Sequence, residues 1–458
     1  MIRFNRHLKG NIPGNIAFAI IVIQFLFLTW LQVTKPIRTP VTDDWLYLGI
    51  GSHQVSLLQV DSFELINGHQ QFLVKLIYWM IGILPGTYFS YVWYVNATLA
   101  FLGIYLIVIS QIKFLQKRVS LVQLLIMVLV LSNFKPLYLY MSITGSGLCL
   151  TVLLYGVYYY ARNNMQGRAS ENVKVICAFL APFATGFGIS LAFAYIIETL
   201  FFRMFDKSSR TSRRTIMGIL ITTFGLAASY VLPTIFGVLN SRSPENGASK
   251  LENALEIIKH PLRMFLFIFG LLGSTVTPSS RLDPWLPVLL GILLFVLITL
   301  NLAFRYSFKK IVKLILLNQT PLLGGLMFLS MLIVFRGAEE DSLINEAVAP
   351  RYVMGMALVI LGSLVLIIHQ FEKTWKAQAL TSVLLIVLFC SFSGVKTGFE
   401  WISVRSTQTS ALRDCVDDNS LTMSNCLNLY RPVEEGESSE SDAKTDLRDL
   451  SNYLRIKT

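Results

Sequence analysis

Charged residues are scarce in this sequence. They make up 14% of its 458 residues, whereas hydrophobic residues make up 54% and the mean hydropathy is +0.58. Because an ordinary soluble domain carries about 25% charged residues, the composition excludes a large soluble enzyme. The apolar share also excludes a disordered chain, except near the polar C-terminus. We therefore expect a polytopic membrane protein, in which each spanning helix needs about 20 mostly apolar residues.

The motifs of several enzyme classes are also lacking. The sequence contains no Walker motif, no Gly-x-Gly-x-x-Gly after a strand and no Ser-His-Asp set. The net charge of +12 does not indicate a nucleic-acid partner, because no soluble segment is large enough to form a folded basic face. Instead, Lys and Arg gather at the ends of apolar runs, as in Arg3–Lys9 and Arg203–Arg214. Such clusters are typical of cytoplasmic membrane anchors.

The apolar runs predict an all-α fold with eleven spans, a cytoplasmic N-terminus and an extracytoplasmic C-terminus. The predicted spans are 14–34, 88–112, 119–133, 141–161, 173–186, 187–204, 215–238, 285–304, 311–335, 351–370 and 377–395. Only four of the 27 acidic residues then fall on the inner side, namely Glu171, Glu198, Asp206 and Glu372. Two shorter runs, 72–84 and 262–275, suit interfacial or re-entrant helices on the outer face better than full spans.

This topology divides the chain into two parts. Residues 1–395 form a transmembrane domain, with a first outer loop at 35–88 and a central outer loop at 239–285. Residues 396–458 form a small extracytoplasmic tail. The multi-pass arrangement predicts residence in a membrane.

Cysteine is rare, with five residues in all. Cys149, Cys177 and Cys390 lie in apolar runs and are expected to be inert small hydrophobes. Cys415 and Cys426 lie in the predicted outer tail, where two such thiols are expected to form a disulfide; a pair of unlinked thiols is the alternative. No second Cys or His pair accompanies them, so a zinc site is not predicted.

Acidic residues open the first outer loop. Asp43 and Asp44 follow the first span, and Glu64 lies twenty residues later. Adjacent carboxylates at a membrane surface repel one another, which raises one pKa and creates a general base or a metal ligand. A solvated acidic turn is the alternative. Asp43 and Asp44 could hold one Mg²⁺ or Mn²⁺ with phosphate oxygens, although no cofactor is required.

Polar groups also gather before and on the short helix at 72–84. Asn67 and His69 come just ahead of it, and Lys75 lies on it. Later in the chain, Arg336 ends one predicted span. Arg351 and Tyr352 begin the next, where a guanidinium at headgroup depth can bind a phosphate in two places. An ordinary interfacial Arg-Tyr pair is the alternative.

Carboxylates and phosphate-binding cations at one membrane face fit a particular reaction. A sugar on a polyprenyl phosphate has its lipid in the bilayer and its phosphate among the headgroups. A carboxylate removes the proton of an acceptor hydroxyl, which attacks the anomeric carbon, while a cation stabilises the departing lipid phosphate.

On these residues the chain resembles the polytopic GT-C type glycosyltransferases, and more narrowly the bacterial group with serotype-converting O-antigen glucosyltransferases. The matching positions are Asp43–Asp44, Asn67–Gln70, Thr185–Gly188, Pro350–Tyr352 and, with the tail cysteines, Leu447–Leu450. Many relatives have Asn-Glu-His-Arg where this chain has Asn-Gly-His-Gln. Glu64 and Lys75 are the candidates to replace the missing Glu and Arg.

The resemblance implies a glycosyltransferase at the outer face of the inner membrane. Its donor would be a polyprenyl-phosphate sugar, made and flipped by upstream proteins, and its acceptor a surface polysaccharide or lipid-linked glycan of the cell envelope, such as lipopolysaccharide O-antigen. Asp43 or Asp44 would act as base, with Glu64 and His69 in support. Arg351, Tyr352, Lys75, Asn67 and Arg336 would bind substrate. The alternatives are an O-antigen polymerase or ligase, and a lipid-linked oligosaccharide transporter or flippase.

Overall fold

The computed structural model describes most of the apolar chain. The described residues are 12–35, 71–83, 88–115, 119–131, 143–205, 213–235, 259–277, 285–303, 307–336 and 350–370, with short pieces at 399, 402–403 and 406–407. Within these ranges all regular structure is helical, as the sequence predicts. The α-helices are α1 (Ile12–Thr34), α3 (Phe72–Ile83), α4 (Tyr88–Leu115), α5 (Leu121–Leu131), α6 (Ile143–Asn164), α7 (Gly167–Leu180), α8 (Gly186–Phe205), α9 (Arg213–Ile235), α11 (Pro261–Ser274), α12 (Trp285–Ala303), α13 (Phe308–Leu316), α14 (Leu322–Arg336) and α16 (Pro350–Gln370).

Three of these helices are long and apolar enough to cross a membrane, over Ile12–Thr34, Tyr91–Leu115 and Tyr352–His369. Seven shorter apolar helices accompany them. Large apolar side chains are exposed on α1 and α12, including Ile23 at 66% and Leu289 at 62%. Apolar patches of this kind are rare on soluble monomers, so the surface agrees with a membrane protein. The full count of eleven spans stays a prediction, and its last span, 377–395, lies outside the described residues.

Side-chain contacts fix which helix ends lie together. In α1, Gly14 lies beside Ile109 of α4 and Phe25 packs against Trp93, so these two helices run antiparallel. Phe114 and His369 pack with ring centroids 5.0 Å apart, so the C-terminal ends of α4 and α16 coincide. In α14 and α16 the close approaches of Leu322 to Gly362 and Phe328 to Gly355 give an antiparallel pair.

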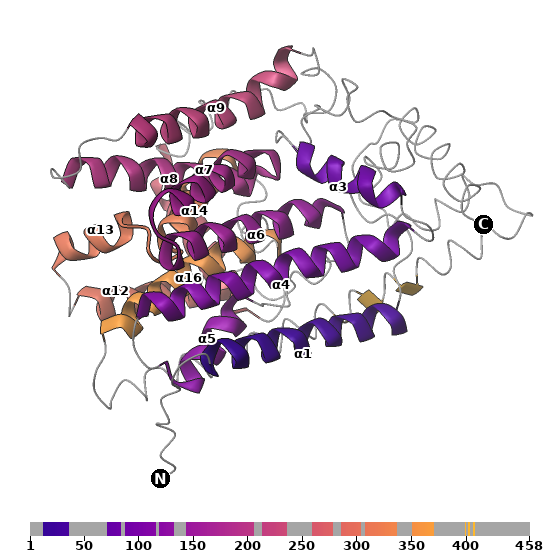
Figure 1. The fold of residues 1–458 in the computed structure, drawn as a ribbon. Helices are drawn as coiled ribbons and strands as arrows, with labels where there is room; N and C mark the ends of the chain where they lie inside the picture. Colours follow the sequence, from indigo (N-terminus) through magenta and orange to yellow (C-terminus); the bar gives the residue numbers. More distant parts are fainter. Residues whose placement is uncertain are drawn as a thin grey trace, which may run out of the picture.

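The bundle therefore has two distinct ends, which Figure 1 shows with α3 at one and α13 at the other. At the α3 end, α1 and α14 finish and α4, α6, α8 and α16 begin. At the α13 end, α4, α6, α8 and α16 finish. The predicted outer loops follow or precede helix termini at the α3 end, and most of the predicted basic anchors flank termini at the α13 end.

Helices α4 and α6 cross at two glycines without intervening side chains. A Cβ atom on Gly156 would lie 2.5 Å from the carbonyl oxygen of Gly103, and one on Gly103 would lie 2.6 Å from the Val152 carbonyl. Backbone cannot yield as a flexible side chain does, so only glycine fits at this crossing. Small residues serve the same purpose in many membrane helix pairs.

A larger side chain at this crossing is expected to separate the two helices. Gly156→Val should lower the free energy of unfolding by about 3 kcal/mol, the upper range for an overpacked interior, measured by denaturant titration in detergent. Gly14→Ala is the matched control, because its added Cβ would meet only the Ile109 side chain at 3.9 Å. Equal effects of the two substitutions would contradict the close crossing.

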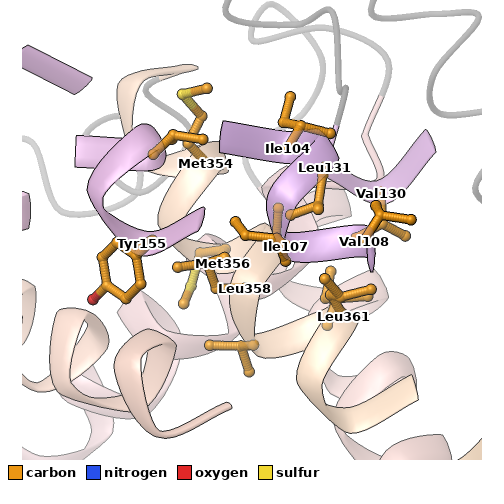
Figure 2. Close-up of a cluster of buried hydrophobic side chains, with 14 of the residues drawn as sticks. Ile104, Ile107, Val108, Val130, Leu131, Tyr155, Met354, Met356, Leu358 and Leu361 are labelled. Carbon is orange, nitrogen blue, oxygen red and sulfur yellow. The ribbon is translucent and has the colours of Figure 1, made fainter. Parts of the chain in front are cut away.

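The core lies between α4, α5, α6 and α16. Figure 2 shows aliphatic side chains from these helices gathered around Ile107 and Leu358, with the Tyr155 hydroxyl directed away from them. A cavity of about 10 Å³ remains among Ile104, Leu131 and their neighbours. That volume is near the minimum for one water molecule, and apolar cavities stay dry. It is a packing defect rather than a substrate site.

One predicted helix differs from the structure, and one helix pair was not predicted. The span predicted at 311–335 is wrong as one helix, because residues 317–321 interrupt it between α13 and α14. The run at 262–275, predicted as an interfacial or re-entrant helix, forms the short helix α11, which packs antiparallel along α12. Its position relative to a membrane stays a prediction. A Cβ on Gly273 would lie 1.7 Å from the Pro287 carbonyl oxygen, and one on Gly291 would lie 1.8 Å from that of Phe269. These paired glycines, which the sequence analysis did not interpret, allow the contact.

Candidate functional site

The short helix α3 forms as predicted over the run 72–84, and it carries a buried cation. Lys75 is only 2% exposed, and Gln71 and Tyr78 on the same face are also buried. These three residues recur at helical spacing of three to four, so they lie on one side of α3, which faces protein together with the buried Val74 and Ile81. A buried lysine requires compensating partners, so this side chain belongs to the interior of the α3 end.

Helix α3 packs against α4 and the N-terminal part of α6. Val74 lies within 3.2 Å of the Cβ position of Gly147, which itself approaches the Ala184 carbonyl at the turn before α8. Nearby, the Ser146 hydroxyl donates to the Asn96 amide oxygen over 2.6 Å, and both residues are fully buried. The predicted Gly-turn at Thr185–Gly188 therefore lies at the same end as α3.

The two later candidates also fall at this end. Helix α14 ends at Arg336, and α16 begins at Pro350, so Arg351 lies in its first turn as the sequence predicts. Tyr352 is buried rather than exposed in a membrane belt, and its ring lies 6.4 Å from that of Phe328. Tyr352 thus helps to fix the start of α16 against α14.

Several predicted residues lie outside the described residues. These are Asp43, Asp44, Glu64, Asn67, His69, Cys415 and Cys426. The helices constrain where the segment bearing Asp43, Asp44, Glu64, Asn67 and His69 begins and ends. Lys35 follows the last residue of α1 and Gln71 precedes the first residue of α3, and both lie at the α3 end of the bundle. Cys149 and Cys177 are buried free thiols, in agreement with the prediction for them. Among the described residues, no group of three or more His, Cys, Asp or Glu could hold a metal ion.

At the α13 end the structure reveals a polar network that the sequence analysis missed. Glu198 of α8 is fully buried, and its Oε1 atom lies 2.8 Å from Arg162 Nε and 3.4 Å from Lys174 Nζ. The other carboxylate oxygen accepts hydrogen bonds from the Tyr158 hydroxyl and, over 3.1 Å, from Asn318 Nδ2. Both oxygens of the buried carboxylate are therefore paired with donors.

A second carboxylate balances the charge of this network. Lys174 lies 2.9 Å from Glu171 Oε2, and Glu171 also accepts a 2.7 Å hydrogen bond from Tyr195. Glu171 lies ahead of the predicted span at 173–186. Burial alone would raise the pKa of its carboxyl, but Lys174, with help from Tyr195 and Arg162, lowers the pKa below its ordinary value. Arg162, Lys174, Glu171 and Glu198 together are neutral.

The network also holds the break between α13 and α14. Asn318 adopts a left-handed backbone conformation with φ of 48°, which only a few residue types accept readily. Its amide bridges the Tyr159 hydroxyl and Glu198. Arg162 donates to the Leu317 carbonyl, and Asn163 donates to that of Gln319. Side-chain donors thus replace the backbone bonds that the interruption removes.

The sequence contains one signal for this site. The polar run Asn318-Gln319-Thr320-Pro321 interrupts an otherwise apolar stretch, and proline disfavours helix at the residue before it. Its partners could not be named, because Tyr158 and Glu198 are 160 and 120 residues away from Asn318.

No family model, no curated protein and no solved structure matches this chain. The fold alone defines the class, which is a helical protein with apolar helices of transmembrane length.

Proposed function

We propose that the protein is a membrane glycosyltransferase of the GT-C type, which transfers a sugar from a polyprenyl phosphate to a polysaccharide or lipid-linked glycan. The main support is the gathering of helix termini at the α3 end. The segment bearing Asp43 and Asp44 leaves α1 there, and the segment bearing Glu64 and His69 leads into α3. Arg351 begins α16 at the same end.

The proposed step uses these groups in distinct roles. Asp43 or Asp44 accepts the proton of the acceptor hydroxyl, whose oxygen forms a bond to the anomeric carbon of the sugar. The bond from that carbon to the lipid phosphate oxygen breaks, and its electron pair leaves with the phosphate. Arg351, at the helix start where amide groups and the helix dipole favour anions, stabilises the leaving phosphate.

The remaining candidates orient the two substrates. Lys75 is buried, so it would act on the phosphate through its positive charge from the interior of the α3 end, and Arg336 contributes from the end of α14. Glu64, Asn67 and His69 position the sugar or the acceptor, and Tyr352 keeps the first turn of α16 in place through Phe328. The α3 end would face outward from a bacterial inner membrane, with the N-terminus in the cytoplasm, and upstream proteins would make and flip the donor.

One observation bears on the transporter alternative. A broken helix beside buried charges is typical of transporter binding sites. Here, however, Glu198 is paired with donors through both oxygens and the four charged residues neutralise one another. This pairing indicates a network that stabilises the structure rather than a site that binds and releases a transported substrate.

A transfer assay tests the proposal directly. Membranes containing the protein, given a radiolabelled polyprenyl-phosphate sugar and envelope glycan, should move label into the glycan, and membranes from the gene deletion should not. The same deletion should remove one sugar from the surface polysaccharide. Equal incorporation in both membranes, with unchanged polysaccharide composition, would reject the glycosyltransferase.

A further inference from the structure

Helix α13 divides its surface into three stripes. At 3.6 residues per turn, Lys309, Lys310 and Lys313 fall within an arc of about 100°, and all three are exposed. The remaining residues of α13 are apolar, and none is fully buried. Charged and apolar residues are therefore fully separated around this helix.

The apolar residues separate further into two stripes. Ile311, Leu314 and Ile315 pack against the hydrophobic core. Phe308, with Val312 and Leu316 one and two turns later, forms the other stripe, and Phe308 is 81% exposed. One apolar stripe thus packs on the bundle, the second is half-buried except for the exposed Phe308 at its start, and the lysines form the third.

This division suits a helix at a membrane surface. Helix α13 lies at the end of the bundle opposite α3 (Figure 1), beyond the break that Arg162 and Asn163 hold. An interfacial helix buries its apolar side among acyl chains and directs its basic side to headgroups. Residues 284–338 of the sequence contain no Asp or Glu, so α13 itself carries a net positive charge.

We infer that α13 is a binding surface for anionic phospholipid headgroups of the leaflet at the α13 end. The lysines supply the attraction to lipid phosphate, and the stripe headed by Phe308 enters the acyl region beside it. Each basic residue near an anionic lipid surface strengthens attraction about fivefold. Occupation of this surface would hold α13, and through the break α14, at a fixed depth.

Lipid titration of the purified full-length protein tests this inference. In zwitterionic detergent, phosphatidylglycerol should raise the thermal unfolding midpoint, whereas phosphatidylcholine and inorganic phosphate should not. In 1 M NaCl, where the Debye length is about 3 Å, the effect should largely disappear. Wild-type protein that responds equally to phosphatidylglycerol and phosphatidylcholine would overturn the inference without any variant.

Two matched variants locate the surface. Lys309→Gln/Lys313→Gln should weaken the apparent affinity for phosphatidylglycerol on the order of 25-fold. Lys113→Gln/Arg168→Gln removes the same charge from exposed residues of α4 and α7 at the same end, and should leave the affinity within about twofold of wild type. Equal losses in both variants would show a diffuse charge effect and reject α13 as the site. Lys309→Arg/Lys313→Arg should retain binding.

Discussion

Replacing Glu198 with alanine is expected to lower the free energy of unfolding by about 3–5 kcal/mol, the usual effect of removing one partner from a buried ion pair. The substitution leaves Arg162 without its 2.8 Å carboxylate partner and deprives the Tyr158 and Asn318 donors of their shared acceptor. Denaturant titration of the purified protein, followed by tryptophan fluorescence, measures the change. Helix content in circular dichroism should be nearly unchanged before the transition.

Glu171→Gln provides the comparison. Glu171 also pairs with Lys174, but its side chain is 31% exposed, so water can take over part of the interaction. A loss of about 1 kcal/mol or less is expected there. Glu198→Gln should fall between the two, because an amide keeps one acceptor oxygen but not the charge. If Glu198→Ala and Glu171→Gln proved equally mild, the buried network would not be what holds α6, α8 and the break together.

Sugar transfer is expected to fall by at least 100-fold in Asp44→Asn and in Arg351→Ala. Loss of a general base typically reduces the rate 10²–10⁴-fold, and loss of a group that stabilises developing negative charge reduces it by about 10²–10³-fold. The measurement is initial-rate transfer from labelled polyprenyl-phosphate sugar by equal amounts of purified protein. Asp43→Asn, tested alongside, decides which of the adjacent carboxylates is the base.

Two controls separate catalysis from folding and topology. Arg168→Ala removes an exposed arginine at the opposite end of the bundle and should transfer sugar at the wild-type rate. Arg351→Lys keeps the charge without the planar fork and should retain part of the activity. Cysteines placed at positions 44 and 351 should react with the same impermeant reagent from outside intact cells. Full activity in both Asp44→Asn and Arg351→Ala, or labelling from opposite sides, would refute the assigned roles.

The sequence predicted the regular parts of the fold because apolar runs of transmembrane length leave few alternatives. Helices α1, α9, α12 and α16 begin and end within about three residues of the predicted limits. The start of α16 was predicted at residue 351 and lies at Pro350, where the fixed φ of proline is well tolerated. The short helix α3 followed from a short apolar run that begins after a polar segment.

The remainder depended on contacts between distant positions. Glu198 was visible as an acidic residue in an apolar run and Asn318 as the start of a short polar run, but only the fold shows that they share a hydrogen bond. The pairing of α11 with α12 depends on Gly273 and Gly291, and a glycine alone does not reveal which helix approaches it. Lys75 was predicted from the sequence to bind substrate at the outer face, whereas in the structure its side chain is only 2% exposed.

The neutral polar network around Glu198 also constrains how the helices would enter a membrane during synthesis. Isolated carboxylates and ammonium groups partition poorly into lipid. Inserting α8 into a bilayer with an unpaired Glu198 would therefore be energetically unfavourable. Arg162 and Lys174 precede Glu198 by 36 and 24 residues, and both counter-ions are therefore already synthesised when α8 leaves the ribosome. Helices α6, α7 and α8 should leave the translocation channel as one unit, and Asn318 joins them only after a further 120 residues have been made.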